Sequence, residues 1–300
     1  MARVRFSGET RAAYLFLSPW LIGFLVFTAG SMVASFVLSL TSYDVINPPS
    51  WVGLDNYREA WSDPVARRAL WNTFYYTVFH VPLATIIALL LAMLLNRIRK
   101  VQGFFRTVFY LPSMTPAVAV GVLFLLLLNG QTGMLNRFLG LFGIPGPGWT
   151  TEADWIMPGI ILMSLWGVGG TMVIFLAALK DVPVELYEAG AIDGVGRWSR
   201  FRHITLPMIS GAVFFSVITN TIGSLQMFTQ VYTMYFGTGS KFSSDAATLY
   251  LIYLFQSAFT FLRMGYASAL AWILFVIIVV ITLIQVVFGN RFVYYEAEDK

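Results

Sequence analysis

Six long apolar stretches dominate this 300-residue sequence and limit what it can fold into. Each is long enough for a membrane-spanning helix, which needs at least about 18 residues with few charges. At a rise of about 1.5 Å per residue, each helix would cross a hydrocarbon core of about 30 Å. The stretches are Tyr14–Leu40, Thr73–Leu95, Val108–Leu128, Trp155–Leu179, Met208–Phe236 and Ala267–Phe288. We therefore predict an all-α membrane protein with six transmembrane helices.

The composition supports this prediction, because 58% of the residues are hydrophobic and only 11% are charged. About a quarter of an ordinary soluble domain is charged. The first apolar stretch follows a basic leader, as the core of a signal peptide does. It is longer than such a core and contains no small-residue cleavage site, so we expect a retained anchor. The sequence contains no cysteine, which excludes disulfides and cysteine-ligated metals.

Lysine and arginine are distributed unevenly among the segments that join the apolar stretches. Thirteen of the 19 basic residues fall on the side of the N-terminal leader, and six fall on the other side. Cytoplasmic segments carry the excess of basic residues in membrane proteins. We therefore expect both termini and the polar segment Glu185–Pro207 to face the cytoplasm. The net charge of +4 reflects this bias, and no basic cluster interleaved with aromatic residues points to nucleic acid.

One further apolar segment, Ala246–Leu262, is short and is interrupted by Gln256 and Ser257. At this length, an interfacial or re-entrant helix is more consistent with the sequence than a seventh span.

The segment Glu185–Pro207 is the most polar part of the middle of the chain. Pro183 suits the first turn of a helix, and Gly194 suits the left-handed residue that often ends one. A second short helix is expected over Arg197–Ile204. Such a helix–turn–helix can be a docking element for another protein or an amphipathic element that lies on lipid, and the residues alone leave both interpretations open.

The spacing within this segment resembles the EAA signature of the permease subunits of binding-protein-dependent ABC importers. That signature is Glu-Ala-Ala, three residues, Gly, nine residues and Ile-x-Leu-Pro. The matching residues, which the resemblance assigns to coupling with an ATPase, are Glu188, Ala189, Gly190, Asp193, Gly194, Ile204, Leu206 and Pro207. Gly190 replaces the second alanine of the signature and is also small. The sequences "AIDG" and "LP" resemble the carbohydrate-uptake subgroup of this family.

The resemblance extends along nearly the whole chain. The segments "GLDNY", "FRTVFYLPSMTPAVAVGVLF", "GMLNRFLG" and "RMGYASALAWILF" resemble family segments and occur in the family's order. The resemblance implies the type I ABC importer permease fold in the cytoplasmic (inner) membrane of a prokaryote. Residues 13–290 would form the permease domain, with a coupling loop over 181–207. Residues 1–12 and 291–300 would form a cytoplasmic leader and tail.

The resemblance also implies the partners of this chain. They are a sister permease subunit, two ATP-binding subunits and an extracytoplasmic solute-binding protein. The sequence contains no G-x-x-x-x-G-K-[ST] motif, so ATP and Mg²⁺ are expected on the partner ATPases and no cofactor on this chain. The subunit would be a transport component without its own ATPase site, acting on a sugar or a related polyol.

In this family, substrate contacts lie at the middle of the third, fourth and fifth spans. The resemblance therefore points to Ser113, Ala117, Trp166, Gly167, Gly170, Ser224 and Met227, and we add the adjacent polar residue Gln226. The fifth span is the most polar one and also contains Thr219, Asn220 and Gln230. The alternative reading of such polar groups is interhelical hydrogen bonding, and of the glycines, close helix packing.

Two other classes of protein fit the sequence less well. A secondary transporter would place acidic or basic residues deep in its spans, whereas the acids here lie in loops or at span ends. A membrane enzyme would need a clustered catalytic set, and the two histidines are far apart in the sequence. His80 lies beside Pro82 in the second span, where a packed, hydrogen-bonded residue is favoured over a proton relay. The sequence does not distinguish a sugar, an oligosaccharide, a polyol or a glycerol phosphate as the solute.

Overall fold

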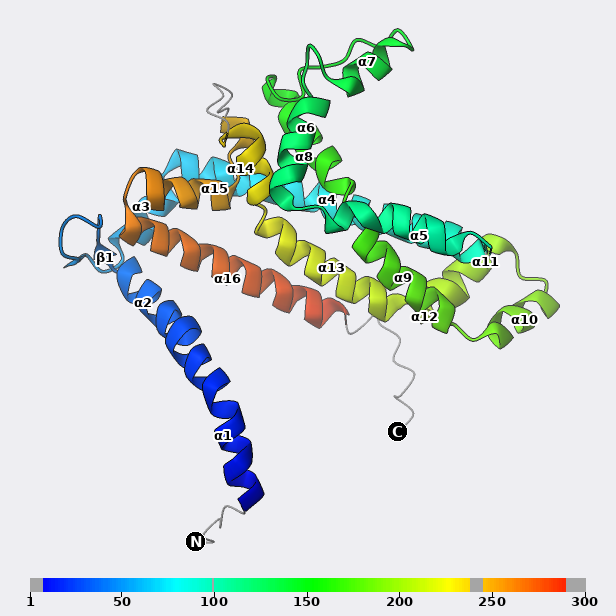
Figure 1. Cartoon of the computed structure of the whole chain (residues 1–300), viewed down its shortest axis with the longest axis horizontal. Helices are drawn as coiled ribbons and strands as arrows, with labels where there is room; N and C mark the ends of the chain where they lie inside the picture. Colours follow the sequence, from blue (N-terminus) through cyan, green and yellow to red (C-terminus); the bar gives the residue numbers. More distant parts are fainter. Residues whose placement is uncertain (1–7, 99, 238–244, 290–300) are drawn as a thin grey trace. The chain divides into compact units, whose positions relative to one another are not determined.

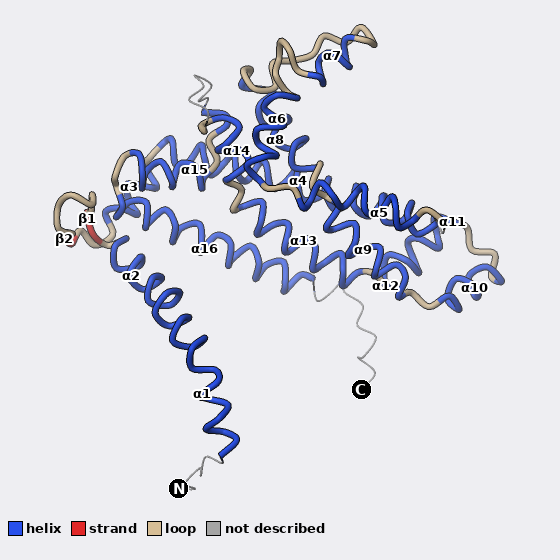
Figure 2. The backbone as a smooth tube through the Cα atoms, viewed as in Figure 1, coloured by secondary structure: helices blue, strands red, loops and turns tan. Residues whose placement is uncertain are grey.

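The computed structural model describes residues 8–98, 100–237 and 245–289, and helices make up most of these ranges (Figures 1 and 2). The predicted tail 291–300 and the first seven residues of the predicted leader lie outside them. The chain divides into two compact units. The smaller unit holds residues up to Asp63 together with Leu254–Phe275, and the larger holds Pro64–Tyr253 and the chain from Val276.

The smaller unit begins with a long apolar helix. The elements of this unit are α1 (Gly8–Gly23), the π-helix η1 (Phe24–Ala29), α2 (Gly30–Ser39), β1 (Thr41–Ser42), β2 (Ser50–Trp51), α3 (Asp55–Ser62), the π-helix η5 (Gln256–Thr260) and the first part of α16 (Met264–Gly289). The run Ala12–Ser39 is 28 residues long and apolar enough to cross a membrane. Its large apolar side chains are mostly exposed, as expected for a helix whose solvent is lipid. This helix corresponds to the first predicted span.

Polar contacts hold the base of this helix to the rest of the smaller unit. β1 and β2 pair antiparallel, and Figure 2 shows them beside the end of α2. The side-chain amide of Asn56 donates to the carbonyl oxygens of Ser39 and Thr41, both at 2.9 Å. Arg263 donates to both carboxylate oxygens of Glu59 at 2.6 and 2.7 Å. These bonds join α2, α3 and the beginning of α16.

The larger unit is built around the longest helix of the described chain (Figure 1). Its elements are α4 (Pro64–Arg97), α5 (Gln102–Tyr110), the 3-10 helix η2 (Leu111–Met114), α6 (Ala117–Leu127), α7 (Met134–Gly140), α8 (Ala153–Leu165), α9 (Gly169–Asp181), α10 (Val184–Ile192), α11 (Arg197–Arg200), the π-helix η3 (Phe201–Thr205), α12 (Leu206–Met208), α13 (Ser210–Leu225), α14 (Thr229–Tyr235), the 3-10 helix η4 (Asp245–Ala247) and the last part of α16. α4 packs against α8, α9 and α13.

A stripe of alanines allows α9 to approach α4 closely. Ala84, Ala88 and Ala92 recur every four residues, so they lie on one face of α4, and all three are buried. They belong to one core cluster with Met172 and Phe175 of α9, which are fully buried. Small residues on one helix let the larger side chains of its neighbour pack at short range, which is how membrane helices associate.

The structure contains four helices long and apolar enough to cross a membrane, or up to six spans if each of two bent helix pairs is one span, within the described residues. α5 and η2 meet α6 at an angle of 97°, and α8 meets α9 at 48°. The sequence predicted Val108–Leu128 and Trp155–Leu179 as single spans and did not foresee these breaks. Pro116 explains the first break, because it lacks an N–H group and disfavours helical backbone at Thr115, which is extended.

The segment Ala246–Leu262 contains only short helices. They are η4, α15 (Tyr250–Phe255) and the π-helix η5 (Gln256–Thr260). None of them is a candidate span among the described residues. This agrees with the prediction that the segment does not form a seventh span.

The glycine that begins α9 permits the close approach of this helix to α5. A β-carbon on Gly169 would overlap the carbonyl oxygen of Phe109. We therefore expect Gly169→Ala to destabilise the protein by about 1–3 kcal/mol, the usual range for overpacking. Gly170→Ala is the matched control, since its β-carbon would meet no atom within 4 Å. Thermal unfolding of both variants in detergent measures the difference, and equal melting temperatures would contradict the packing described.

Candidate functional site

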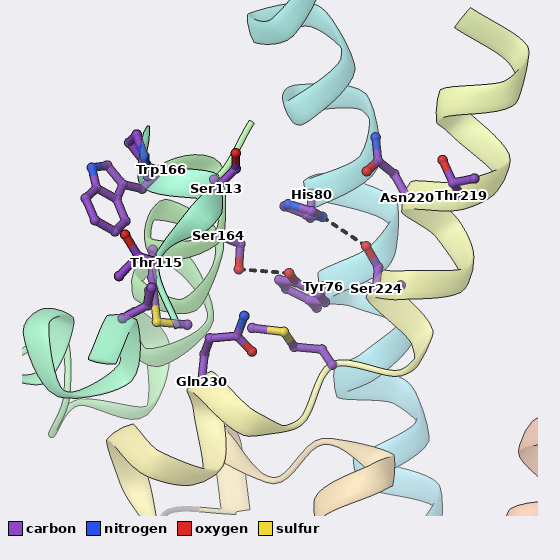
Figure 3. Close-up of a pocket in the computed structure, with 16 residues that line it drawn as sticks. Tyr76, His80, Ser113, Thr115, Ser164, Trp166, Thr219, Asn220, Ser224 and Gln230 are labelled. Carbon is purple, nitrogen blue, oxygen red and sulfur yellow. Dashed lines mark hydrogen bonds between the residues drawn. The ribbon is translucent and has the colours of Figure 1, made fainter. Parts of the chain in front are cut away.

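A cavity of about 300 Å³ lies in the larger unit where three helical segments are interrupted (Figure 3). The interruptions lie between η2 and α6, between α8 and α9, and between α13 and α14. The lining residues are Tyr76, His80, Pro112, Ser113, Thr115, Val120, Met163, Ser164, Trp166, Gly167, Thr219, Asn220, Gly223, Ser224, Met227 and Gln230. Non-helical backbone at membrane depth is tolerated where it lines a cavity, so the position of the breaks is consistent with a solute pathway.

A short hydrogen-bonded turn satisfies part of the backbone at each of the three breaks. Gly167 donates its N–H to the carbonyl of Ser164 at 3.2 Å, and Met227 donates to the carbonyl of Ser224 at the same distance. At the third break, Thr115 donates to the carbonyl of Pro112 at 3.1 Å. Each break therefore turns the chain without unwinding it over many residues.

Two hydrogen bonds from α4 organise the wall of the cavity. The hydroxyl of Tyr76 donates to Ser164 Oγ of α8 at 2.8 Å. His80 Nδ1 lies 2.9 Å from Ser224 Oγ of α13. The rings of Tyr76 and His80 are stacked, with centroids 5.0 Å apart (Figure 3). His80 is hydrogen-bonded and stacked, as the sequence favoured, and it also lines the cavity.

The cavity wall also carries an aromatic ring and two side-chain amides. The indole of Trp166 packs edge-on against Phe124, with ring centroids 5.7 Å apart, and stays partly exposed. Asn220 and Gln230 contribute side-chain amides (Figure 3). None of the described residues that line the cavity is Asp, Glu, Lys or Arg. The cavity therefore offers a stacking surface and neutral hydrogen-bonding groups.

Five of the eight residues predicted to contact substrate line this cavity. They are Ser113, Trp166, Gly167, Ser224 and Met227. The other three lie elsewhere. Ala117 and Gly170 are half-buried outside the cavity wall, and Gln226 is an exposed residue at the end of α13. For all eight residues, contact with a substrate stays a prediction, and the geometry of the cavity favours the five that line it.

The sequence missed several residues of the cavity wall. Asn220 and Gln230 carried a signal, because both are polar residues of the fifth span. Tyr76 and Ser164 carried none, since nothing local in the sequence shows that they meet across α4 and α8. Gln226 was added because it is polar and adjacent to Met227 in the sequence, but the break after α13 changes which side chains face inward.

The segment with the EAA spacing folds as a hairpin of short helices. α10 ends before Gly194, whose φ of 71° is left-handed, as predicted. After it, Val195 donates its N–H to the carbonyl of Gly190 at 2.9 Å. Tyr187 and Thr205 join the two arms through hydroxyl groups 3.0 Å apart. Gly190 is buried and faces Ile204 of the other arm.

The outer surface of this hairpin is exposed. Glu188, Ala189 and Asp193 are exposed, as are Gly194 and Leu206, and Pro207 is half-buried. The side chain of Ile192 near the tip is 88% exposed. The structure thus separates the eight residues of the signature into two that pack the arms together, Gly190 and Ile204, and six that lie wholly or partly at the surface.

The chain matches the family described as "Binding-protein-dependent transport system inner membrane component" over residues 81–294. It belongs to this family. The resemblance inferred from the EAA spacing is therefore confirmed. The family comprises permease subunits of ABC importers, so the chain is a multi-pass inner-membrane transport subunit, and ATP hydrolysis belongs to separate partner subunits.

Several known proteins are similar to this permease. It is 40% identical to the probable ABC transporter permease protein YesP of Bacillus subtilis (strain 168), covering 97% of this chain and 94% of YesP. It is 35% identical to the lactose transport system permease protein LacF of Rhizobium radiobacter, covering 91% of this chain and 92% of LacF.

The fold is that of a solved bacterial ABC transporter involved in the import of the acidic polysaccharide alginate. The TM-score is 0.82 at 24% identity, and the alignment covers 94% of this chain and 96% of that chain. The predicted all-α, type I ABC importer permease fold is confirmed by this likeness.

Proposed function

We propose that this permease carries an uncharged sugar or a related polyol across the membrane. The cavity at the helix breaks carries the proposal, because its described lining is neutral, hydroxyl- and amide-rich and includes Trp166. Sugars combine hydroxyl groups with an apolar face that stacks on aromatic rings. The similarity to a lactose permease supports the same class of solute.

The absence of lysine and arginine among the described lining residues favours a neutral solute over an anionic one. A phosphate ester or an acidic sugar would need a cationic partner such as arginine to replace its hydration. No described residue that lines the cavity is lysine or arginine. The volume that this chain contributes is about 300 Å³, at the lower end of small-molecule sites.

Gln230 provides a direct test of the cavity. We expect Gln230→Ala to lower uptake of a neutral sugar by about tenfold, since a lost hydrogen bond in a desolvated site is worth about 1–1.5 kcal/mol. Gln226→Ala is the matched control, because Gln226 lies outside the cavity wall. The measurement is uptake into proteoliposomes that contain the complete transporter, with a panel of neutral and acidic mono- and disaccharides. Preference for the acidic sugars, or equal effects of the two variants, would contradict the proposal.

We further propose that the hairpin 181–207 couples this subunit to an ATPase. Coupling through such a loop is general to the family. The left-handed turn at Gly194 and the exposed Glu188 and Ile192 leave the hairpin surface available for docking. The remaining partners would be a sister permease that completes the pathway, a second ATPase and an extracytoplasmic binding protein that delivers the solute. ATP and Mg²⁺ would bind only to the ATPases.

Substitution at the hairpin turn tests the coupling. Gly194→Val opposes a positive φ, at a cost of about 1–2 kcal/mol, and should reduce solute-stimulated ATP hydrolysis while membrane insertion stays normal. Gly196→Val is the control in the same loop, because Gly196 has a φ of −66° and open space around its α-carbon. Hydrolysis at the wild-type rate in Gly194→Val would contradict the assignment. So would loss of activity only in Trp198→Asp, which indicates docking on lipid.

We also propose that both termini and the hairpin face the cytoplasm, on the distribution of lysine and arginine in the sequence. A reporter enzyme that is active only in the cytoplasm should be active when it is fused after Lys300. The same reporter inserted after Arg137, in α7, should be inactive, because α7 is expected outside the cytoplasm. A periplasmic signal from the C-terminal fusion would mean that the chain crosses the membrane once more than proposed.

A further inference from the structure

A second concave site lies beside the hairpin, away from the solute cavity. It is a groove of about 470 Å³ in the larger unit, between the end of α4, the end of α9 and the segment α11–η3. Three arginines line it: Arg97 of α4, and Arg197 and Arg200 of α11. The proposed transport and coupling functions do not use these three side chains.

Among the described residues, the arginines of this groove have no partner of opposite charge. No described acidic residue lines the groove, and none of the three arginines forms an ion pair in the part of the chain that the structure describes. Arg200 is half-buried, and its Nε is a buried donor without a hydrogen-bond acceptor. One Nη of Arg200 reaches the carbonyl of Val195 at 3.4 Å. Three like charges in a concavity favour an anion that accepts several hydrogen bonds.

Part of the groove wall is apolar, and its neutral polar residues are Asn96, Tyr187 and Thr205. Met93, Leu179 and Phe201 line it together with the arginines. Arg97 follows the apolar part of α4 by two residues, so the groove lies where a spanning helix leaves the hydrocarbon. A ligand that suits both parts of this wall has an anionic head and an apolar body.

We propose that this groove binds the phosphate of an anionic phospholipid. The guanidinium groups of Arg97, Arg197 and Arg200 would hold the phosphate, and the apolar wall would contact the glycerol and the first acyl carbons. The cytoplasmic leaflet carries the anionic lipids, so the proposal uses the orientation of the hairpin proposed above. It does not depend on which solute is transported. A lipid in this position would touch both α4 and the coupling hairpin.

Titration of the full-length chain with single lipids tests the proposal. The delipidated protein in mild detergent is titrated with dioleoyl phosphatidylglycerol or dioleoyl phosphatidylcholine, and bound lipid is counted by native mass spectrometry. We expect one phosphatidylglycerol to bind about tenfold or more tightly than phosphatidylcholine. The double variant Arg97→Gln/Arg200→Gln should lose this preference. Arg202→Gln is the control, because it removes an exposed charge of the same loop that does not line the groove.

Several results would overturn the proposal. Equal binding of the two lipids, or equal losses in the double variant and in Arg202→Gln, would show that the groove does not select an anionic lipid. Displacement of phosphatidylglycerol by millimolar inorganic phosphate would show a site for free anions instead. Release of the lipid on addition of the ATPase, with ATPase binding lost in the double variant, would assign the groove to an acidic side chain of that partner. Gel filtration and melting temperature establish that each variant is folded.

Discussion

The packing of α9 on the alanine face of α4 is the contact on which the larger unit depends. In lipid, apolar side chains gain no hydrophobic free energy by meeting each other, so helices associate through close van der Waals contact. Ala84, Ala88 and Ala92 provide that contact along about two turns. Because α4 is a single helix of 34 residues, it positions the cavity and the arginine groove together. His80 and Arg97 lie about 25 Å apart along it.

The interruptions in the other helices have a common physical basis. A broken helix leaves backbone groups that lipid cannot satisfy. The structure confines the breaks to the wall of one cavity, where turns and polar side chains meet those groups. The close approach at Gly169 keeps α9 against α5 despite the bend in the chain. A cavity with polar walls thus exists inside an otherwise apolar unit.

Much of this arrangement could be predicted from the sequence, and the remainder depended on tertiary contacts. Apolar length predicted the spans, and the requirement for positive φ predicted the turn at Gly194. The sequence could not predict which side chains point into the cavity after a helix break, because the helical periodicity does not continue through non-helical backbone. This explains why Gln226 was chosen and Gln230 lines the cavity. Tyr76 was missed since its partner Ser164 is 88 residues away in the sequence.

The hydrogen bonds of the hydroxyl groups in the cavity wall determine whether the wall or the solute donates the proton. Tyr76 donates its proton to Ser164, and Ser164 donates to the carbonyl of Ile160. Ser113 likewise donates to the backbone carbonyl of Tyr110, and Thr219 to that of Phe215. These oxygens therefore present lone pairs to the interior, and their protons are already used. A sugar hydroxyl that meets them would act as the donor, so the wall would recognise the hydrogens of the solute as much as its oxygens.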